Sequence, residues 1–199
     1  KDGYFPGLLE GVDQKKRRSV WYLILRTIGL RSPKEHIEFW RKIRNSRTRF
    51  IIKEDYLILG DYLWAFMKSY TLVKGIKKIP RWRKYDVSSL LYDELSKALG
   101  SRTLIEALMC YRMFRRLRAA GITIDGVVDW HENQVIDRAL CLGIRKNYPN
   151  CPIKGYQGYV VPEYYVHHDV SSFEKKANTV PDEICVVSPL LLQQKKQYC

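Results

Sequence analysis

The chain has 199 residues, of which 46% are hydrophobic and 13% aromatic, a composition that excludes a disordered protein and supports a sizeable core. The five cysteines are odd in number and form no CxxC pair, so neither a disulfide framework nor a zinc site is expected, and reduced thiols place the protein in the cytoplasm. Lys and Arg outnumber Asp and Glu by 35 to 21, and the resulting net charge of +14 favours polyanionic partners: nucleic acid, anionic lipid headgroups or phosphorylated substrates.

The first half of the chain alternates short apolar runs with helical patterns. Ser32-Pro33 supplies an N-cap and a first-turn proline for a helix that runs to about Asn45. Ser101 is a second N-cap, after Gly100. The predicted strands are Ser19–Ile28 and Arg49–Ile52, the other predicted helices are Glu54–Val73, Val87–Leu99 and Arg102–Ala120, and a basic connection spans Gly75–Arg83.

The segment from Ile124 to Pro162 predicts strand, polar turn, helix and strand. A β-prone run ends at Asp129-Trp130, and the polar residues 131–134 begin a helix that Tyr148-Pro149 ends. Ile153 to Val161 is the next strand, and a further buried strand follows Pro181. Ligands of such α/β units lie at the carboxyl ends of the strands, so we expect a site at residues 129–134 and 156–158.

Strands that alternate with helices predict an α/β fold, specifically a Rossmann-like, mainly parallel sheet with helices on both faces. We expect one domain at residues 1–180. Residues 181–199 then begin a second domain, because their strand follows a polar linker. The chain lacks an initiator Met, so we expect it to be a piece of a longer protein.

Asp129, His131 and Glu132 are the only tight group of titratable residues beside a predicted strand end. Either carboxylate could act on a substrate proton, or it could simply cap the following helix. Asn133 and Gln134 offer amides, which suit sugar hydroxyls because both groups donate and accept hydrogen bonds.

A second group of candidate residues lies between Lys154 and Tyr159. Gly155 and Gly158 allow close backbone approach or positive φ, Gln157 could contact a polar ligand, and Tyr156 or Tyr159 could stack on a sugar face. The alternative is a β-bulge with a surface glutamine. The glycine spacing fits neither a dinucleotide fingerprint nor a P-loop. His167-His168-Asp169 lacks a third ligand at a sensible spacing, so no metal site is predicted.

These motifs resemble those of a known family. The pattern resembles the middle of bacterial surface-carbohydrate glycosyltransferases of GT-B architecture, the enzymes of capsule and O-antigen assembly. The residues that carry the resemblance are Asp129, Trp130, Glu132, Asn133, Gln134, Tyr148, Pro149, Gly155, Tyr156, Gln157, Gly158 and Pro181 to Val187, about a third of the chain.

The resemblance implies the acceptor-side half of a metal-independent glycosyltransferase. Glu132 or Asp129 would then be the catalytic base, and the substrate-binding residues would be His131, Asn133, Gln134, Tyr156, Gln157 and Gly158. The acceptor would be a saccharide or a lipid-linked sugar, met at the inner membrane surface through the basic face. A nucleotide-sugar donor would be needed by the full-length enzyme, no other cofactor is implied, and we expect the 199 residues alone to transfer no sugar.

The alternative from a different class is a basic nucleic-acid-binding module. It rests on the net charge of +14 and on the aromatic-basic stretch Ile79 to Tyr85, where Trp82 could stack on a base. No recognisable RNA-binding or helix-turn-helix motif accompanies that stretch. A non-catalytic scaffold at the membrane surface is a third reading of the same charge.

Overall fold

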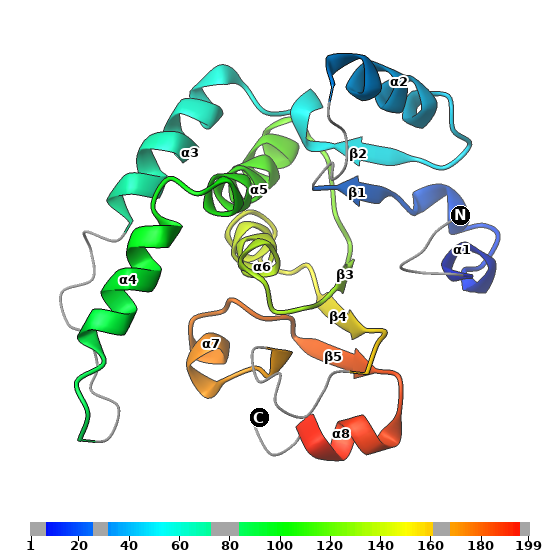
Figure 1. Cartoon of the computed structure of the whole chain (residues 1–199). Helices are drawn as coiled ribbons and strands as arrows, with labels where there is room; N and C mark the ends of the chain where they lie inside the picture. The colour runs from blue at the N-terminus through cyan, green and yellow to red at the C-terminus, as the bar shows by residue number, and fades with distance from the viewer. Residues whose placement is uncertain (1–6, 26–31, 73–83, 161–167, 196–199) are drawn as a thin grey trace. The chain divides into compact units, whose positions relative to one another are not determined.

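The computed structural model describes residues 7–25, 32–72, 84–160 and 168–195 (Figure 1). The chain forms two compact units, Lys1–Tyr56 and Leu57–Cys199, each with its own small parallel sheet. Within the described residues, no helix is both long enough and apolar enough to cross a membrane.

The first unit is a small α/β element. It contains α1 (Leu8–Gly11), β1 (Tyr22–Ile24), α2 (Pro33–Arg44) and β2 (Phe50–Ile52), with short 3-10 turns at Arg17–Ser19 and Lys53–Asp55. β1 and β2 pair in parallel. The predicted cap of α2 is confirmed, because the Ser32 side chain accepts a hydrogen bond from the Glu35 amide at 3.2 Å.

The second unit begins with a set of helices. These are α3 (Leu59–Thr71), α4 (Ser88–Ala98) and α5 (Arg102–Ala119). Ser101 caps α5 as predicted, by accepting from the Leu104 amide, and Gly100 before it adopts a positive φ of 63°. The predicted helix over 54–73 begins five residues later, at Leu59, after the short 3-10 turn.

A three-stranded parallel sheet follows α5. Its strands are β3 (Val127–Trp130), β4 (Ile153–Gln157) and β5 (Glu183–Val186), in the order β3-β4-β5, and α6 (Val135–Asn147) connects the first two. The register pairs Asp129 with Gly155 and Gly155 with Ile184. The short helices α7 (Ser172–Lys176) and α8 (Pro189–Lys195) flank β5 in sequence. The predicted α/β fold with parallel sheets is therefore confirmed.

The domain boundary expected at residue 180 falls inside this sheet. β5 begins only three residues later and pairs with β4 along its whole length, from Lys154↔Glu183 to Gln157↔Val186. The compact units instead divide between Tyr56 and Leu57.

The core of the second unit lies between α5 and α6, which pack along one another (Figure 1). Their close approach requires Gly143, since a Cβ there would lie 2.6 Å from the Phe114 ring and 3.1 Å from the Tyr111 carbonyl oxygen. The buried side chains of this interface include Ala107, Cys110, Met113, Phe114 and Leu117 from α5 and Ile136, Leu140, Cys141 and Ile144 from α6.

A buried ion cluster joins α3 to α5. The carboxylate of Asp61 is fully buried and accepts hydrogen bonds from Arg112 Nε at 2.8 Å, Arg116 Nε at 2.7 Å and the Ile58 amide at 3.2 Å. Burial alone raises the pKa of Asp61, but the bonds from Arg116, Ile58 and Arg112 outweigh it and hold the pKa below its usual value. Arg112 and Arg116, which contribute to the net positive charge, thus neutralise a buried carboxylate.

The apolar side of α3 is more exposed than its sequence suggests. Its run of apolar residues suggests a largely buried helix, yet the aromatic residues Phe66 and Tyr70 are 52% and 47% exposed, and Leu63 and Met67 are 57% and 68% exposed. The buried side chains of α3 are Asp61, Ala65 and Ser69, and Trp64 stacks on Tyr111 of α5, with ring centroids 6.3 Å apart.

Replacing Asp61 by Asn should lower the free energy of unfolding by roughly 3 kcal/mol, because Arg112 and Arg116 would then lose the buried counter-charge that they share. Urea denaturation followed by tryptophan fluorescence measures this change, since Trp64 lies against Arg112. The matched control is Asp93→Asn, which removes an exposed pair with Lys97 on α4 and should hardly move the midpoint. If the two substitutions lowered the free energy of unfolding equally, the buried Asp61 cluster would contribute no more to stability than an exposed ion pair.

Candidate functional site

The loop 131–134 joins the carboxyl end of β3 to α6. We expected these residues to begin the helix, but α6 begins at Val135, with Gln134 as its N-cap. The His131 amide donates to the Tyr156 carbonyl at 3.0 Å and so extends the pairing of β3 with β4. Asn133 then turns the chain with a φ of 56°, in the left-handed region that asparagine tolerates better than most residues.

The helix is capped by a residue that we had not predicted. Asp137 Oδ2 accepts hydrogen bonds from the amides of Glu132, at 3.0 Å, and Gln134, at 2.9 Å. Capping was the alternative role for Asp129 and Glu132, and no such backbone hydrogen bond is formed by either carboxylate within the described residues. Asp137 fills that role and leaves the two candidate acids available for others.

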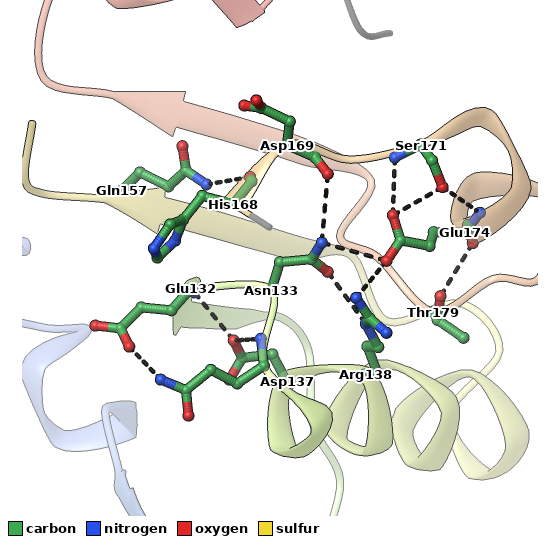
Figure 2. Close-up of polar contacts among 11 residues, drawn as sticks. Glu132, Asn133, Asp137, Arg138, Gln157, His168, Asp169, Ser171, Glu174 and Thr179 are labelled. Carbon is green, nitrogen blue, oxygen red and sulfur yellow. Dashed lines mark hydrogen bonds and ion pairs between the residues drawn. The ribbon is translucent and has the colours of Figure 1, made fainter. Parts of the chain in front are cut away.

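Glu132 is half-buried at the mouth of this loop. Its carboxylate accepts a hydrogen bond from Trp130 Nε1 at 3.0 Å and another from Gln134 Nε2, and Figure 2 shows the Glu132 side chain. The Trp130 ring lies edge-on to Tyr156, with centroids 5.7 Å apart, and 5.6 Å from Tyr159. The arrangement is an accessible carboxylate held beside aromatic rings.

Asn133 is buried and committed to structural hydrogen bonds. Its Nδ2 donates to Glu174 Oε1 at 3.2 Å, and its Oδ1 accepts from Arg138 Nε at 3.3 Å (Figure 2). Glu174 is also paired with Arg138 and accepts from the Ser171 amide and hydroxyl, at 2.8 and 2.9 Å. Asn133 therefore ties the loop to α6 and to the start of α7.

Gln157 is likewise inside the molecule. Only 2% of it is exposed, and its Nε2 donates to the His168 carbonyl at 3.2 Å (Figure 2). Tyr159, further along the same segment, donates through its hydroxyl to the His131 carbonyl at 3.2 Å and lies 2.9 Å from His168 Nδ1. Burial is the main cause that raises the pKa of Tyr159, so its phenol remains protonated.

The two glycines of the 154–159 segment are needed for close approach. A Cβ at Gly155 would lie 3.0 Å from His131 Cβ and 2.9 Å from Pro181 Cγ, and one at Gly158 would lie 2.6 Å from the Trp130 ring. Neither glycine has a positive φ. Of the two reasons considered from the sequence, close approach is the one that applies.

Asp129 on β3, His131 in the loop and Asp137 on α6 form a compact, mainly acidic cluster. One donor atom from each residue lies within 4.8 Å of the others. His131 is fully buried, and the Asp129 side chain is 11% exposed. Burial, and then the charge of Asp129, raise the pKa of Asp137 to about 6 against the lowering effect of its two backbone hydrogen bonds and of His131.

The structure brings the predicted site residues to adjacent carboxyl ends but leaves few of them accessible. Glu132, Gln134, Tyr156 and Gly158 retain solvent-exposed surface. The side chains of His131, Asn133 and Gln157 are buried, and Asp129 points toward His131. The accessible part of the candidate site is thus Glu132 and Gln134 with the rings of Trp130 and Tyr156.

Several supporting residues were missed from the sequence. Asp137 could have been found, because it stands three positions after the N-cap, where acidic side chains commonly reach back to the backbone. Arg138, His168 and Glu174 gave no such signal, since their contacts with the loop and with Tyr159 depend on the folding of distant segments. His167, which was paired with His168 in the sequence analysis, lies outside the described residues.

Comparison of the chain with protein-family models, curated proteins and solved structures finds no match. The site must therefore be interpreted from its own geometry.

Gly155→Ala should destabilise the second unit by about 1–3 kcal/mol, because the added methyl overlaps His131 and Pro181. Thermal unfolding measures the loss. Gly126→Ala is the matched control, since a Cβ there would meet only Pro152, at an ordinary 3.6 Å. A Gly155 variant as stable as the Gly126 variant would show that the two strands can separate without cost.

Glu174 should make stability depend on pH. Burial raises the pKa of its carboxyl, but the hydrogen bonds from Ser171 and the charge of Arg138 lower the pKa by more than burial raises it. The folded pKa therefore lies below the unfolded one. The stabilisation is then present above the unfolded pKa of about 4.3 and is lost as pH falls through the folded pKa.

Glu174→Gln should consequently lower the free energy of unfolding by about 2 kcal/mol at pH 7 and by much less near pH 3. Urea denaturation at the two pH values measures the difference. Glu183→Gln, which removes an exposed pair with Lys154, should show no comparable pH dependence.

Proposed function

We propose that the chain is the acceptor-side part of a glycosyltransferase of surface-polysaccharide synthesis. The observation that supports this most is the half-buried Glu132 carboxylate, which is hydrogen-bonded to the Trp130 indole at 3.0 Å beside Tyr156 at the carboxyl ends of parallel strands. Aromatic rings offer apolar faces to a sugar, and a nearby carboxylate can bind or deprotonate a hydroxyl.

Glu132 suits the role of general base better than Asp129 does. Trp130 and Gln134 each donate one hydrogen bond to it, which orients the carboxylate while it retains solvent access. Asp129 is turned toward buried His131. In the proposed reaction a Glu132 oxygen takes the proton of the acceptor hydroxyl. The hydroxyl oxygen attacks the anomeric carbon of the donor at the same time, and the nucleoside diphosphate leaves with the electrons of the broken bond.

The acceptor would bind across the accessible residues. Gln134 is exposed next to Glu132, and its amide oxygen, which the bond from Nε2 to Glu132 does not use, can accept from a sugar hydroxyl; Tyr156 offers part of its ring. Asn133 and Gln157 support this surface from within and are not proposed to contact the sugar, because their amides are engaged elsewhere. A lipid-linked acceptor at the inner membrane surface suits the net charge of +14.

Saccharide binding by this chain is the first test. Ligand-observed NMR with a panel of bacterial surface oligosaccharides should show binding that Tyr156→Ala weakens about tenfold or more, because the stacking surface is lost. Glu183→Ala, at an exposed position beyond the loop, is the control and should bind as the wild type does. Failure of the wild-type chain to bind any member of the panel would count against the proposal.

In the full-length enzyme, Glu132→Gln should reduce kcat by about 100-fold or more while KM for the acceptor changes little, since the amide keeps the shape but cannot take a proton. Steady-state kinetics with a radiolabelled donor measures both constants. An unchanged kcat would remove Glu132 from the chemistry and favour a scaffold at the membrane surface.

The nucleic-acid alternative predicts binding of RNA in place of saccharide. Its aromatic-basic stretch lies mostly outside the described residues, where Trp82 is also found. Submicromolar binding of single-stranded RNA with a steep loss of affinity at higher salt would support that alternative in place of the transferase.

A further inference from the structure

His131 has a buried imidazole whose hydrogen-bonding capacity is unused. The side chain is 0% exposed, and neither ring nitrogen has a hydrogen-bond partner within the part of the chain that the structure describes. Asp129 Oδ2, in the same place, is also buried and without one. Buried polar atoms without a hydrogen-bond partner are rare because each lowers stability, so three such atoms together call for a common cause.

The distance between two of these atoms indicates what the cause is. His131 Nδ1 and Asp129 Oδ2 are 3.7 Å apart, too far for a hydrogen bond. Two donor atoms that each lie about 2.1 Å from one tetrahedral ion are separated by about 3.4 Å, so 3.7 Å is close to the spacing of coordinating atoms. The carboxylate of Asp137 completes a three-residue set within 4.8 Å.

The charges in the cluster favour a cation. Two carboxylates lie beside one imidazole, and within the described residues neither has an ion pair with Lys or Arg. Asp137 uses Oδ2 for the backbone of the loop, which leaves Oδ1 for a ligand. Without a counter-ion, two carboxylates this close repel one another in a medium that screens charge poorly.

We propose that Asp129, His131 and Asp137 form a binding site for one divalent transition-metal ion. One nitrogen and two oxygen donors suit ions of the manganese-to-zinc series better than magnesium or calcium, which prefer all-oxygen sets. No metal was expected from the sequence, because the cysteines form no CxxC pair, His167-His168-Asp169 lacks a third ligand, and the family that the chain resembles is metal-independent.

The ion would restrict the movement of the loop that carries Glu132. Asp129 lies on β3, His131 in the loop and Asp137 in the first turn of α6, so one ion would link the strand, the loop and the helix. The inference is independent of the proposed transferase activity, because it depends only on the buried cluster, and metal binding can be measured without any sugar.

Zinc titration of the chelator-treated 199-residue protein by isothermal calorimetry provides the first measurement. We expect one site, and Asp129→Asn should weaken it about 100-fold or more, because it replaces an ionised ligand by an amide. Two controls test other candidate ligands: His36→Gln removes a histidine on α2, and Cys185→Ser removes an exposed thiol. Both should bind zinc as the wild type does.

X-ray absorption of the zinc-loaded wild type makes the test independent of how well the variants fold. We expect only nitrogen and oxygen neighbours at about 2.0–2.2 Å, with the scattering pattern of one imidazole. Sulfur neighbours at about 2.3 Å would assign the ion to thiols and overturn the proposal. The absence of stoichiometric binding, or equal affinity in wild type and Asp129→Asn, would overturn it as well.

Discussion

The parallel pairing of β3 with β4 is the constraint on which the rest of the site depends. Parallel strands bring their carboxyl ends to the same side of a sheet, so the loop after β3 and the segment after β4 meet although their sequences are 26 positions apart, as Val127↔Ile153 shows. The register holds because Gly155 leaves room for His131 and Pro181.

The loop between β3 and α6 is held from three sides, which is unusual for a surface connection. Asp137 binds its amides from the helix, Glu174 and Arg138 bind Asn133, and Tyr159 binds the His131 carbonyl. Loops that present functional groups gain precision from such support, since positioning errors of a fraction of an ångström weaken both binding and catalysis. The buried polar residues therefore fix the geometry, and Glu132 is the side chain that they present.

The sequence predicted the elements well where local signals decide them. Ser32, Ser101 and Tyr148-Pro149 marked helix ends that the structure confirms, because caps and breakers act through neighbouring backbone groups. The carboxyl-end location of residues 129–134 and 156–158 also followed from strand alternation alone.

Burial could not be predicted in the same way. The amides of Asn133 and Gln157 looked suited to a sugar, but distant residues, Glu174 and His168, bury them and use their hydrogen-bonding groups. The exposed apolar side of α3 is the converse case, because an apolar pattern does not reveal that a buried carboxylate, Asp61, forms ion pairs with α5. Long-range partners determine which polar groups remain available.

The order β3-β4-β5 leaves one outer edge on β3 and one on β5 within the described residues. Backbone amides and carbonyls along such edges are ready to pair with an additional strand. A strand that joins in parallel beside β3 would end next to the loop carrying Glu132, so extension of the sheet on that side would add its own terminal side chains to the surface proposed to bind sugar. Growth beside β5 would leave that surface unchanged, and the two edges therefore differ in what an added strand can contribute.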